Sequence, residues 1–225
     1  MTQSDPTQKL EARAALLLEV RRAGVRDLEV MRAIETAPRE LFAPHRFKDL
    51  ADRNMALPIG CGQSMPSPAD LGRRLEALET KPHHRVFEVG TGSGYGAAVL
   101  ARLAREVVSV ERFETLAIEA AKRLSSLSVA NALVLFGDGL SPSRALGAFD
   151  RILLHVCVEE APRPLVELLA PGGVMVFGRL APAAAGKRRR ARLVRLVRDQ
   201  KGALRETELG ECRLGAAVPG MALAL

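Results

Sequence analysis

The sequence has few aromatic residues and no long apolar run. Its 225 residues include no tryptophan, one tyrosine and seven phenylalanines. Single-stranded nucleic acid is bound by stacking its bases on aromatic side chains, so this composition argues against such a partner. No stretch approaches the roughly 20 apolar residues that cross a bilayer, and the first residues show no signal peptide. We therefore expect a cytoplasmic protein that does not bind a membrane.

Cysteine and histidine are also scarce, and their spacing fits no metal or redox site. The three cysteines, an odd number, are Cys61, Cys157 and Cys212. The four histidines, which lack a ligand spacing as well, are His45, His83, His84 and His155. We expect no metal, and we expect free thiols in a reducing compartment.

The chain is basic, with 33 Lys and Arg against 26 Asp and Glu, a formal net charge of +7. The excess lies in scattered arginines and in one run at residues 187–190. Such a run is more often a solvated loop than a nucleic-acid patch, although it could attract acidic substrates. The 48% hydrophobic content is typical of one globular domain.

The most informative stretch is residues 85–103. Residues 85–89 predict a buried parallel strand, and residues 96–103 are helix-forming. Between them, Gly90, Gly92 and Gly94 allow a sharp turn and a close approach to a ligand at the helix N-terminus. Nicotinamide, flavin and S-adenosylmethionine (AdoMet) binders share this pattern. A tight turn without any ligand is the alternative.

Acidic residues follow three predicted strands and narrow the choice of ligand. Glu88 ends the first strand, Glu111 closes strand 106–110, and Asp138 lies in the Gly-Asp-Gly turn after strand 132–136. Glu111 is placed to accept hydrogen bonds from ribose hydroxyls, and Asp138 from an adenine amine. Dinucleotides need the helix N-terminus for a pyrophosphate. Three carboxylates better suit AdoMet, which is cationic and has no phosphate.

The rest of the chain predicts helices first and further strands later. Helical patterns cover residues 10–20 and 30–34, with a stop at Gly24 and a break at Pro38. Residues 57–68 contain three prolines and two glycines, which excludes helix and regular strand. This loop is placed to form a lid or substrate wall, or else a simple connector. Ser67 is expected to cap a helix that begins at Pro68.

Strands at 150–155 and 174–178, with a helix at 163–169 between them and a turn at 171–173, continue the alternation of strands and helices. Strands 192–198 and 204–210 are close enough to form a hairpin. The fold class we expect is α/β, a doubly wound parallel sheet with a C-terminal antiparallel hairpin.

With these motifs in view, the chain resembles the protein-L-isoaspartate O-methyltransferase family over nearly its whole length. The most specific match joins an N-terminal signature to the loop Ala56-Leu57-Pro58-Ile59-Gly60. The stretches that carry the likeness are residues 24–27, 30–34, 38–42, 56–63, 88–95, 97–101, 137–139, 149–150 and 169–173.

The resemblance implies a Rossmann-like, seven-stranded AdoMet methyltransferase sheet in a single domain, residues 1–225. Residues 1–80 would form N-terminal helices and the substrate loop, 81–180 the AdoMet-binding core, and 181–225 the hairpin. The implied reaction methylates the α-carboxylate of isoaspartyl residues in damaged peptides and proteins, which starts their repair through a succinimide. The implied AdoMet-binding residues are Ser64, Glu88, Gly90, Thr91, Gly92, Ser93, Gly94, Glu111, Gly137 and Asp138. The implied substrate-binding residues are Leu57, Pro58 and Ile59.

The chain departs from the family pattern on the substrate side. The family's loop usually reads Gln-Thr-Ile-Ser-Gln-Pro, and its serine is the residue usually called active. That serine is Pro66 here, which removes a hydroxyl and a backbone N–H donor. Ser64 and Ser67 are the candidates to replace it. The other departures are Asn54 for an acid, Asp52 for a tyrosine, Gly178 for a proline, and residues 212–215 for a Phe-Val-Pro element.

Methyl transfer to a carboxylate does not require a strong base, because a carboxyl group with a pKa of ~3.5 is already ionised at pH 7. The protein has to align the oxygen with the methyl group and exclude water. The changed substrate side keeps two alternatives open: a paralogue that binds AdoMet but methylates another acceptor, and a non-catalytic binding or regulatory protein.

Overall fold

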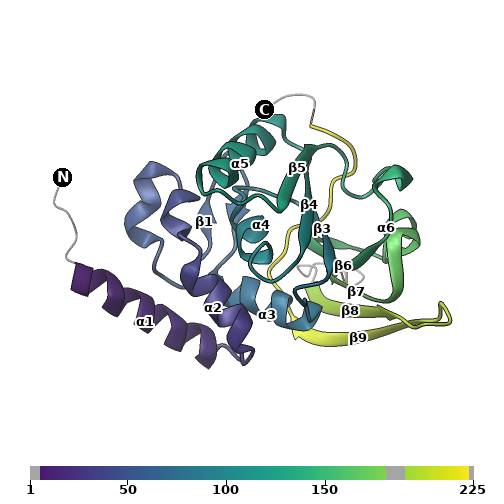
Figure 1. Cartoon of the computed structure of the whole chain (residues 1–225), viewed down its shortest axis with the longest axis horizontal. Helices are drawn as coiled ribbons and strands as arrows, with labels where there is room; N and C mark the ends of the chain where they lie inside the picture. The colour runs from purple at the N-terminus through teal and green to yellow at the C-terminus, as the bar shows by residue number, and fades with distance from the viewer. Residues whose placement is uncertain (1–5, 181–190, 223–225) are drawn as a thin grey trace, which may run out of the picture.

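The computed structural model describes residues 6–180 and 191–222, so the basic run at 187–190 lies outside the described residues. Within them a seven-stranded sheet runs in the order β5-β4-β3-β6-β7-β8-β9 (Figure 1). The strands are β3 (Arg85–Val89), β4 (Glu106–Glu111), β5 (Ala132–Phe136), β6 (Phe149–Val158), β7 (Leu169–Leu180), β8 (Ala191–Arg198) and β9 (Leu204–Glu211). The first five are parallel, and β8 and β9 add antiparallel to the edge of β7. The expected sheet and hairpin are confirmed.

The order in which the chain adds strands reverses at β3. The strands that follow it, β4 and β5, lie on one side of β3, and β6 and β7 lie on the other. In open parallel sheets, ligands bind at such a switch point, beyond the carboxyl ends of the strands. The glycine-rich turn after β3 therefore stands where a ligand site is expected.

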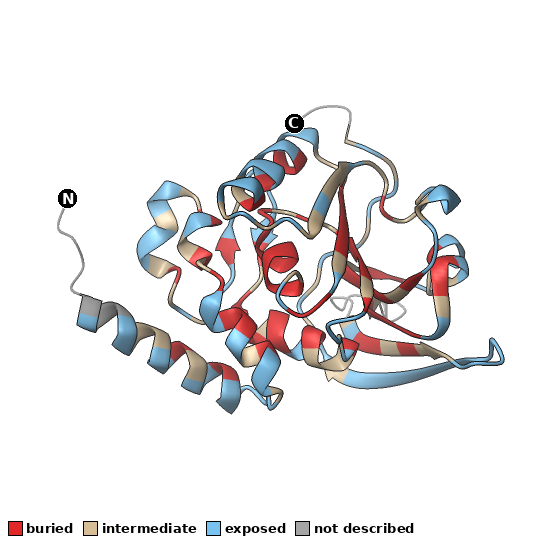
Figure 2. Ribbon diagram, in the orientation of Figure 1, coloured by how far each residue is buried: buried red, intermediate tan, exposed pale blue. Residues whose placement is uncertain are grey.

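The two faces of the sheet are covered unequally. One face packs against α3 (Pro68–Leu78), α4 (Tyr95–Leu100) and α5 (Glu114–Ser126), and α1 (Pro6–Arg22) and α2 (Leu28–Thr36) pack on the outer side of these helices. The other carries α6 (Arg163–Leu168) and a single turn, η3 (Arg144–Leu146). The central strands and α4 are buried almost throughout, whereas α1 shows a mostly exposed surface (Figure 2).

Local signals in the sequence set the helix boundaries. The Asp27 side chain accepts hydrogen bonds from the backbone N–H groups of Glu29 and Val30 and caps α2. Ser67 caps α3 with Pro68 at its first position, as expected. The same helix buries Leu71 and Leu75 because they recur on one face. Between α2 and α3, two short turns, η1 (Arg39–Leu41) and η2 (His45–Leu50), lead into the substrate loop.

The structure corrects three expectations about these elements. The substrate loop does contain paired strand, a hairpin of β1 (Leu57–Pro58) and β2 (Ser64–Met65), because Cys61 and Gly62 adopt positive φ and reverse the chain. Helix α4 ends at Leu100, three residues early, and continues as turns. Strand β7 begins at Leu169 and runs through the expected turn at 171–173. Among the described residues no helix has the length and apolar character needed to cross a bilayer.

Candidate active site

The glycine-rich turn between β3 and α4 is closely packed on both sides. Gly90, Gly92 and Gly94 have φ values of 92°, 55° and 93°, which residues with a side chain rarely adopt. A β-carbon at Gly92 would lie 3.2 Å from Ile59 Cδ1, and one at Gly90 would lie 3.4 Å from His155 Cβ. The positive φ values favour glycine at all three positions, and at Gly92 the side chain of Ile59 also leaves little room for a β-carbon.

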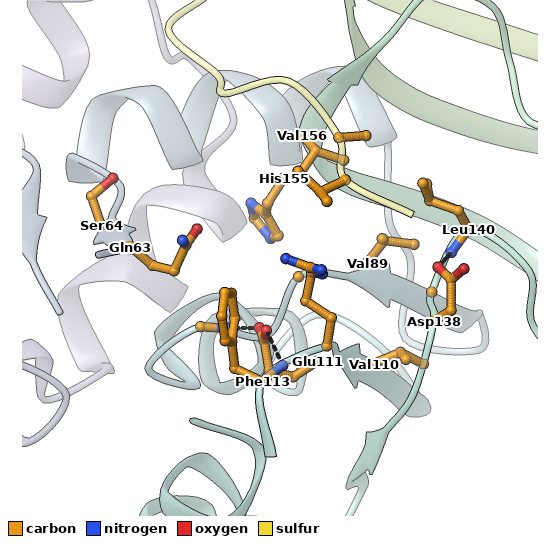
Figure 3. A pocket seen from close by; sticks show the side chains of 16 residues that line it. Gln63, Ser64, Val89, Val110, Glu111, Phe113, Asp138, Leu140, His155 and Val156 are labelled. Carbon is orange, nitrogen blue, oxygen red and sulfur yellow. Dashed lines mark hydrogen bonds between the residues drawn. The ribbon is translucent and has the colours of Figure 1, made fainter. Parts of the chain in front are cut away.

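Glu111, at the end of β4, holds this turn in place. It is 4% exposed, and its two oxygens accept hydrogen bonds from the backbone N–H groups of Gly92 (2.8 Å) and Phe113 (3.0 Å) (Figure 3). Each carboxylate oxygen can accept more than one hydrogen bond, so Glu111 keeps capacity for ligand hydroxyls. It also lines the cavity described next.

A cavity beside the turn, here named the cofactor pocket, is lined by residues at the carboxyl ends of β3, β4, β5 and β6. Five of the ten predicted AdoMet residues line it: Ser64, Gly90, Gly92, Glu111 and Asp138. Apolar walls come from Val89, Val110 and Leu140. The other five predicted residues, Glu88, Thr91, Ser93, Gly94 and Gly137, are not among its lining residues. Carboxylates for hydroxyl and amine groups, together with apolar walls for a base, fit AdoMet.

The C-terminal segment, residues 212–222, closes one side of the cofactor pocket. Asp138 accepts hydrogen bonds from the backbone N–H groups of Leu140 (2.9 Å) and Gly220 (2.8 Å). Arg112 Nε donates to the Gly220 carbonyl at 3.0 Å. Ala217 and Val218 line the pocket itself. These contacts join a segment near the end of the chain to the predicted adenine site.

Beneath the turn lies a buried polar chain that starts at Glu88. Glu88 is fully buried, and its oxygens accept from His155 Nε2 (2.8 Å) and Ser109 Oγ (2.6 Å). Ser109 in turn shares a hydrogen bond with Thr91 of the glycine-rich turn. Side chains alternate between the faces of a strand, and Glu88 lies beside Ser109 in the β3–β4 register, so both point toward α4.

His155 is neutral in this chain of contacts. Burial lowers the pKa of His155, and the positive charge of Arg74 lowers it further, against the opposing effect of Glu88. Because Nε2 donates to Glu88, Nδ1 is left to accept from Arg74 Nη1. Gly96 makes room for the pair, since a β-carbon there would overlap Glu88 Oε1.

A second cavity, here named the acceptor pocket, adjoins the cofactor pocket. The two share Gln63, Ser64, His155 and Val156. Residues from the substrate loop, the start of α3 and the C-terminal segment form its walls, and Pro66 is among them. The pocket is rich in charge, with Asp70, Arg73, Arg74, Glu211 and Arg213 on its lining.

The two candidate serines differ in how they are used. The Ser67 hydroxyl donates to Asp70 Oδ2 (2.8 Å) and accepts from the Asp70 backbone N–H (3.1 Å), so the α3 cap occupies it. Ser64 is exposed, lines both pockets, and its hydroxyl has no hydrogen bond with the described residues. The Pro66 carbonyl accepts from buried Arg39 at 3.0 Å, which anchors the loop.

The structure places the predicted substrate residues beside the pockets rather than on their lining. Leu57 is fully buried in the core, Pro58 is exposed, and Ile59 packs against the glycine-rich turn. None of the three lines either pocket as described. Their role toward the substrate stays a prediction.

The fold and the site together define a class I, AdoMet-type methyltransferase. Residues 11–219 match the family described as protein-L-isoaspartate(D-aspartate) O-methyltransferase. The chain therefore belongs to this family of AdoMet-dependent enzymes.

Individual relatives agree with the family match. The chain is 45% identical over 205 residues to protein-L-isoaspartate O-methyltransferase 2 of Rhodopseudomonas palustris, covering 91% of this chain and 92% of that one. It is 39% identical over 222 residues to the Azorhizobium caulinodans protein-L-isoaspartate O-methyltransferase, covering 99% and 100%.

Two solved structures share the fold. A protein-L-isoaspartate O-methyltransferase superposes with a TM-score of 0.78 at 24% identity, over 92% of this chain and 66% of that one. A Plasmodium falciparum structure, described as a putative protein-L-isoaspartate O-methyltransferase in complex with S-adenosyl-L-homocysteine, superposes with a TM-score of 0.73 at 20% identity. It covers 90% of this chain and 96% of that one.

Sequence reasoning placed residues 212–215 on the substrate side, where they line the acceptor pocket, but it missed three parts of the site: His155, Arg74 and the rest of the C-terminal segment. His155 ends a predicted parallel strand, and the carboxyl end of such a strand is where ligands bind, so a signal was present. Arg74 follows Leu71 by three residues and precedes Leu78 by four, which places it on the apolar face of its helix. For the rest of the C-terminal segment the sequence offers no comparable signal.

Proposed function

We propose that this chain transfers a methyl group from AdoMet to the α-carboxylate of L-isoaspartyl residues in peptides and proteins. The observation that carries the proposal is the meeting of the cofactor and acceptor pockets at Gln63, Ser64, His155 and Val156. Two reactants bound in adjoining pockets meet at the shared wall, which supplies the orientation that a displacement needs.

AdoMet, when bound, supplies a methyl group activated by its sulfonium: a carboxylate oxygen would bond to the methyl carbon while the S–C bond breaks, and S-adenosyl-L-homocysteine would leave as a neutral thioether. In our proposal Glu111 accepts from its ribose hydroxyls and Asp138 from its adenine amine. The backbone of the turn containing Gly90 and Gly92, which lines the cofactor pocket, would lie against its amino-acid part. Glu88, Thr91, Ser93 and Gly94 would act from outside the pocket lining, by fixing the conformation of the turn. Gly137 would hold the end of β4, because its N–H donates to the Glu111 carbonyl at 2.9 Å.

On the acceptor side the chain orients a carboxylate that is already ionised and excludes water from it. Ser64 lies on the shared wall with an uncommitted hydroxyl, so we assign it, rather than Ser67, to hydrogen-bond the acceptor. The substrate loop around Leu57, Pro58 and Ile59 would support the peptide backbone. Both pockets draw residues from the N-terminal, central and C-terminal parts of the chain, which supports one domain acting as a unit. The cytoplasmic location stays a prediction.

The test is an incubation with methyl-labelled AdoMet and two peptides that differ only in isoaspartate against aspartate. Calorimetry measures AdoMet binding in parallel. We expect base-labile label on the isoaspartyl peptide alone. A Gly92→Val variant, strained at its φ and crowded by Ile59, gives the background because it should not bind AdoMet.

Tight AdoMet binding with no label on either peptide would overturn the proposal. Labelling of some other acceptor would then indicate a divergent methyltransferase. Binding without any turnover would indicate a binding or regulatory protein.

A further inference from the structure

Arg74 is a buried cation that forms no direct ion pair with any residue that the structure describes. It is 3% exposed, yet it lines the acceptor pocket. Its Nε donates to the Asp70 backbone carbonyl at 3.0 Å, and Nη1 contacts His155 Nδ1. Among the described residues it makes no ion pair, because the Asp70 carboxylate pairs with Arg73 instead. Nη2 has no hydrogen-bond partner among those residues either.

A buried charge without a partner is costly, and proteins rarely keep one without a use. Burial lowers the pKa of Arg74 to about 10, so the guanidinium remains charged at neutral pH. The pocket it lines is therefore prepared for an anion. A guanidinium binds a carboxylate through two parallel hydrogen bonds, which fixes both the position and the plane of the carboxylate.

The surrounding contacts fix the direction of Arg74. His155 accepts from it only as the neutral tautomer whose Nε2 donates to Glu88. Glu88 is held by Ser109, which is linked to Thr91 of the glycine-rich turn. Because His155 lies on the wall shared by both pockets, the guanidinium bonded to it stands close to where methyl group and oxygen must meet.

We propose that Arg74 binds the α-carboxylate of the isoaspartyl acceptor in place of the serine hydroxyl that Pro66 removes, with His155 and Glu88 as positioning residues. This assignment rests on the proposed function. It makes the acceptor pocket selective for a free carboxylate over a neutral group of the same shape.

The test uses an isoaspartyl peptide and the same peptide with its α-carboxylate converted to a carboxamide. Calorimetry measures the binding of both peptides to the protein loaded with S-adenosyl-L-homocysteine (AdoHcy), the product left after methyl transfer. The carboxylate peptide is also tested as a methyl acceptor. The wild-type protein should prefer the carboxylate peptide by on the order of 10- to 100-fold, the effect of one hydrogen-bonded charge pair. Arg74→Met and Arg74→Gln should bind both peptides with similar, weak affinity and raise KM by a similar factor.

Two controls separate this effect from a loss of folding. Arg151→Met removes another buried arginine, which bonds to the Glu79 carbonyl and does not line either pocket, so peptide preference should not change. AdoHcy binding reports folding in every variant. If either folded neutral variant at position 74 keeps the wild-type preference, the assignment is wrong. If the wild-type protein itself labels no isoaspartyl peptide, the proposed function fails instead.

Discussion

Pro66 changes which hydroxyl groups in the site are available to contact the acceptor. A proline there leaves Ser64 and Ser67 as the nearby hydroxyls, and the structure gives them different tasks. Ser67 caps α3, whereas Ser64 stands free on the wall between the two pockets. The sequence identified both candidates, but only the hydrogen-bond partners distinguish them.

We expect Ser64→Ala to lower kcat/KM for an isoaspartyl peptide by about 2- to 10-fold, the worth of one neutral hydrogen bond, without changing stability. Ser67→Ala should instead lower the free energy of unfolding by about 1 kcal/mol, because it removes a helix cap. Steady-state methylation and urea unfolding of both variants check this. Loss of activity in Ser67→Ala at unchanged stability, with normal kinetics in Ser64→Ala, would reverse the assignment.

His84 makes the stability of the protein depend on pH. It is 7% exposed, and its Nδ1 accepts from the Lys81 backbone N–H at 2.9 Å. Burial, helped by the positive charge of Arg151, lowers the pKa of His84 from 6.5 to about 4. Between these values the unfolded chain binds a proton that the native state does not, so stability falls as pH falls from about 6.5 toward 4.

The His84→Gln variant should therefore lose less stability than the wild type between pH 7 and pH 5, measured by urea unfolding. Its pH slope should shrink without vanishing, because burial lowers the pKa of His155 as well. His45→Gln, which replaces an exposed histidine elsewhere in the chain, is the matched control. Equal slopes in His84→Gln and the wild type would contradict the prediction.

At the scale of single elements, local signals predicted most of the fold. The cap at Ser67 and the helix that begins at Pro68 are encoded in a few neighbouring residues, and the structure confirms them. The pairing of β1 with β2 was missed because it depends on positive φ at Cys61 and Gly62, a backbone state that composition does not specify. Arg74 was missed although it lies on the apolar face of its helix, because its partner His155 lies 81 residues away in the chain.

Helix α4 offers a test of the buried polar chain. An alanine for glycine inside a helix usually stabilises it by about 1 kcal/mol. At Gly96 the added β-carbon would overlap Glu88 Oε1 and lie 3.1 Å from His155 Nε2. We therefore expect Gly96→Ala to destabilise the protein by about 1–3 kcal/mol, as overpacking does, and to weaken AdoMet binding.

Urea unfolding and calorimetry of Gly96→Ala provide the measurement. Gly60→Ala is the control, because its β-carbon would make only an ordinary 3.4 Å contact with Leu116. A Gly96→Ala protein at least as stable as the wild type would show that Glu88 and His155 do not pack against α4 as described.

At the scale of the whole molecule, the site depends on contacts between distant parts of the chain. The Arg112–Gly220 hydrogen bond spans 108 residues, and the Asp138–Gly220 bond spans 82. Figure 1 shows the C-terminal segment leaving β9 and running along the body toward α5. A motif at Gly90 to Gly94 predicts where a cofactor binds, but the lining of its far wall depends on such tertiary contacts, which no local pattern encodes.

This dependence predicts that the C-terminal segment contributes to cofactor affinity. A chain ending at Gly215 loses the Ala217 and Val218 wall and the contact to Asp138, yet keeps the hydrogen bond from the Cys157 N–H to the Gly215 carbonyl. If the two apolar side chains cover about 40–80 Å² of ligand, affinity for AdoHcy falls by about 1–2 kcal/mol, or roughly 5- to 30-fold in Kd.

A chain ending at Ala222 retains the described contacts of the segment and is the matched control for that truncation. Calorimetry with AdoHcy and thermal unfolding of the two shortened chains separate binding from folding. Weaker binding with both chains folded would show that the segment is a wall of the cofactor pocket. Unchanged affinity in the chain ending at Gly215 would limit residues 216–222 to a structural role, whereas tighter binding would show that the hydrogen bond from Gly220 to Asp138 competes with the adenine amine.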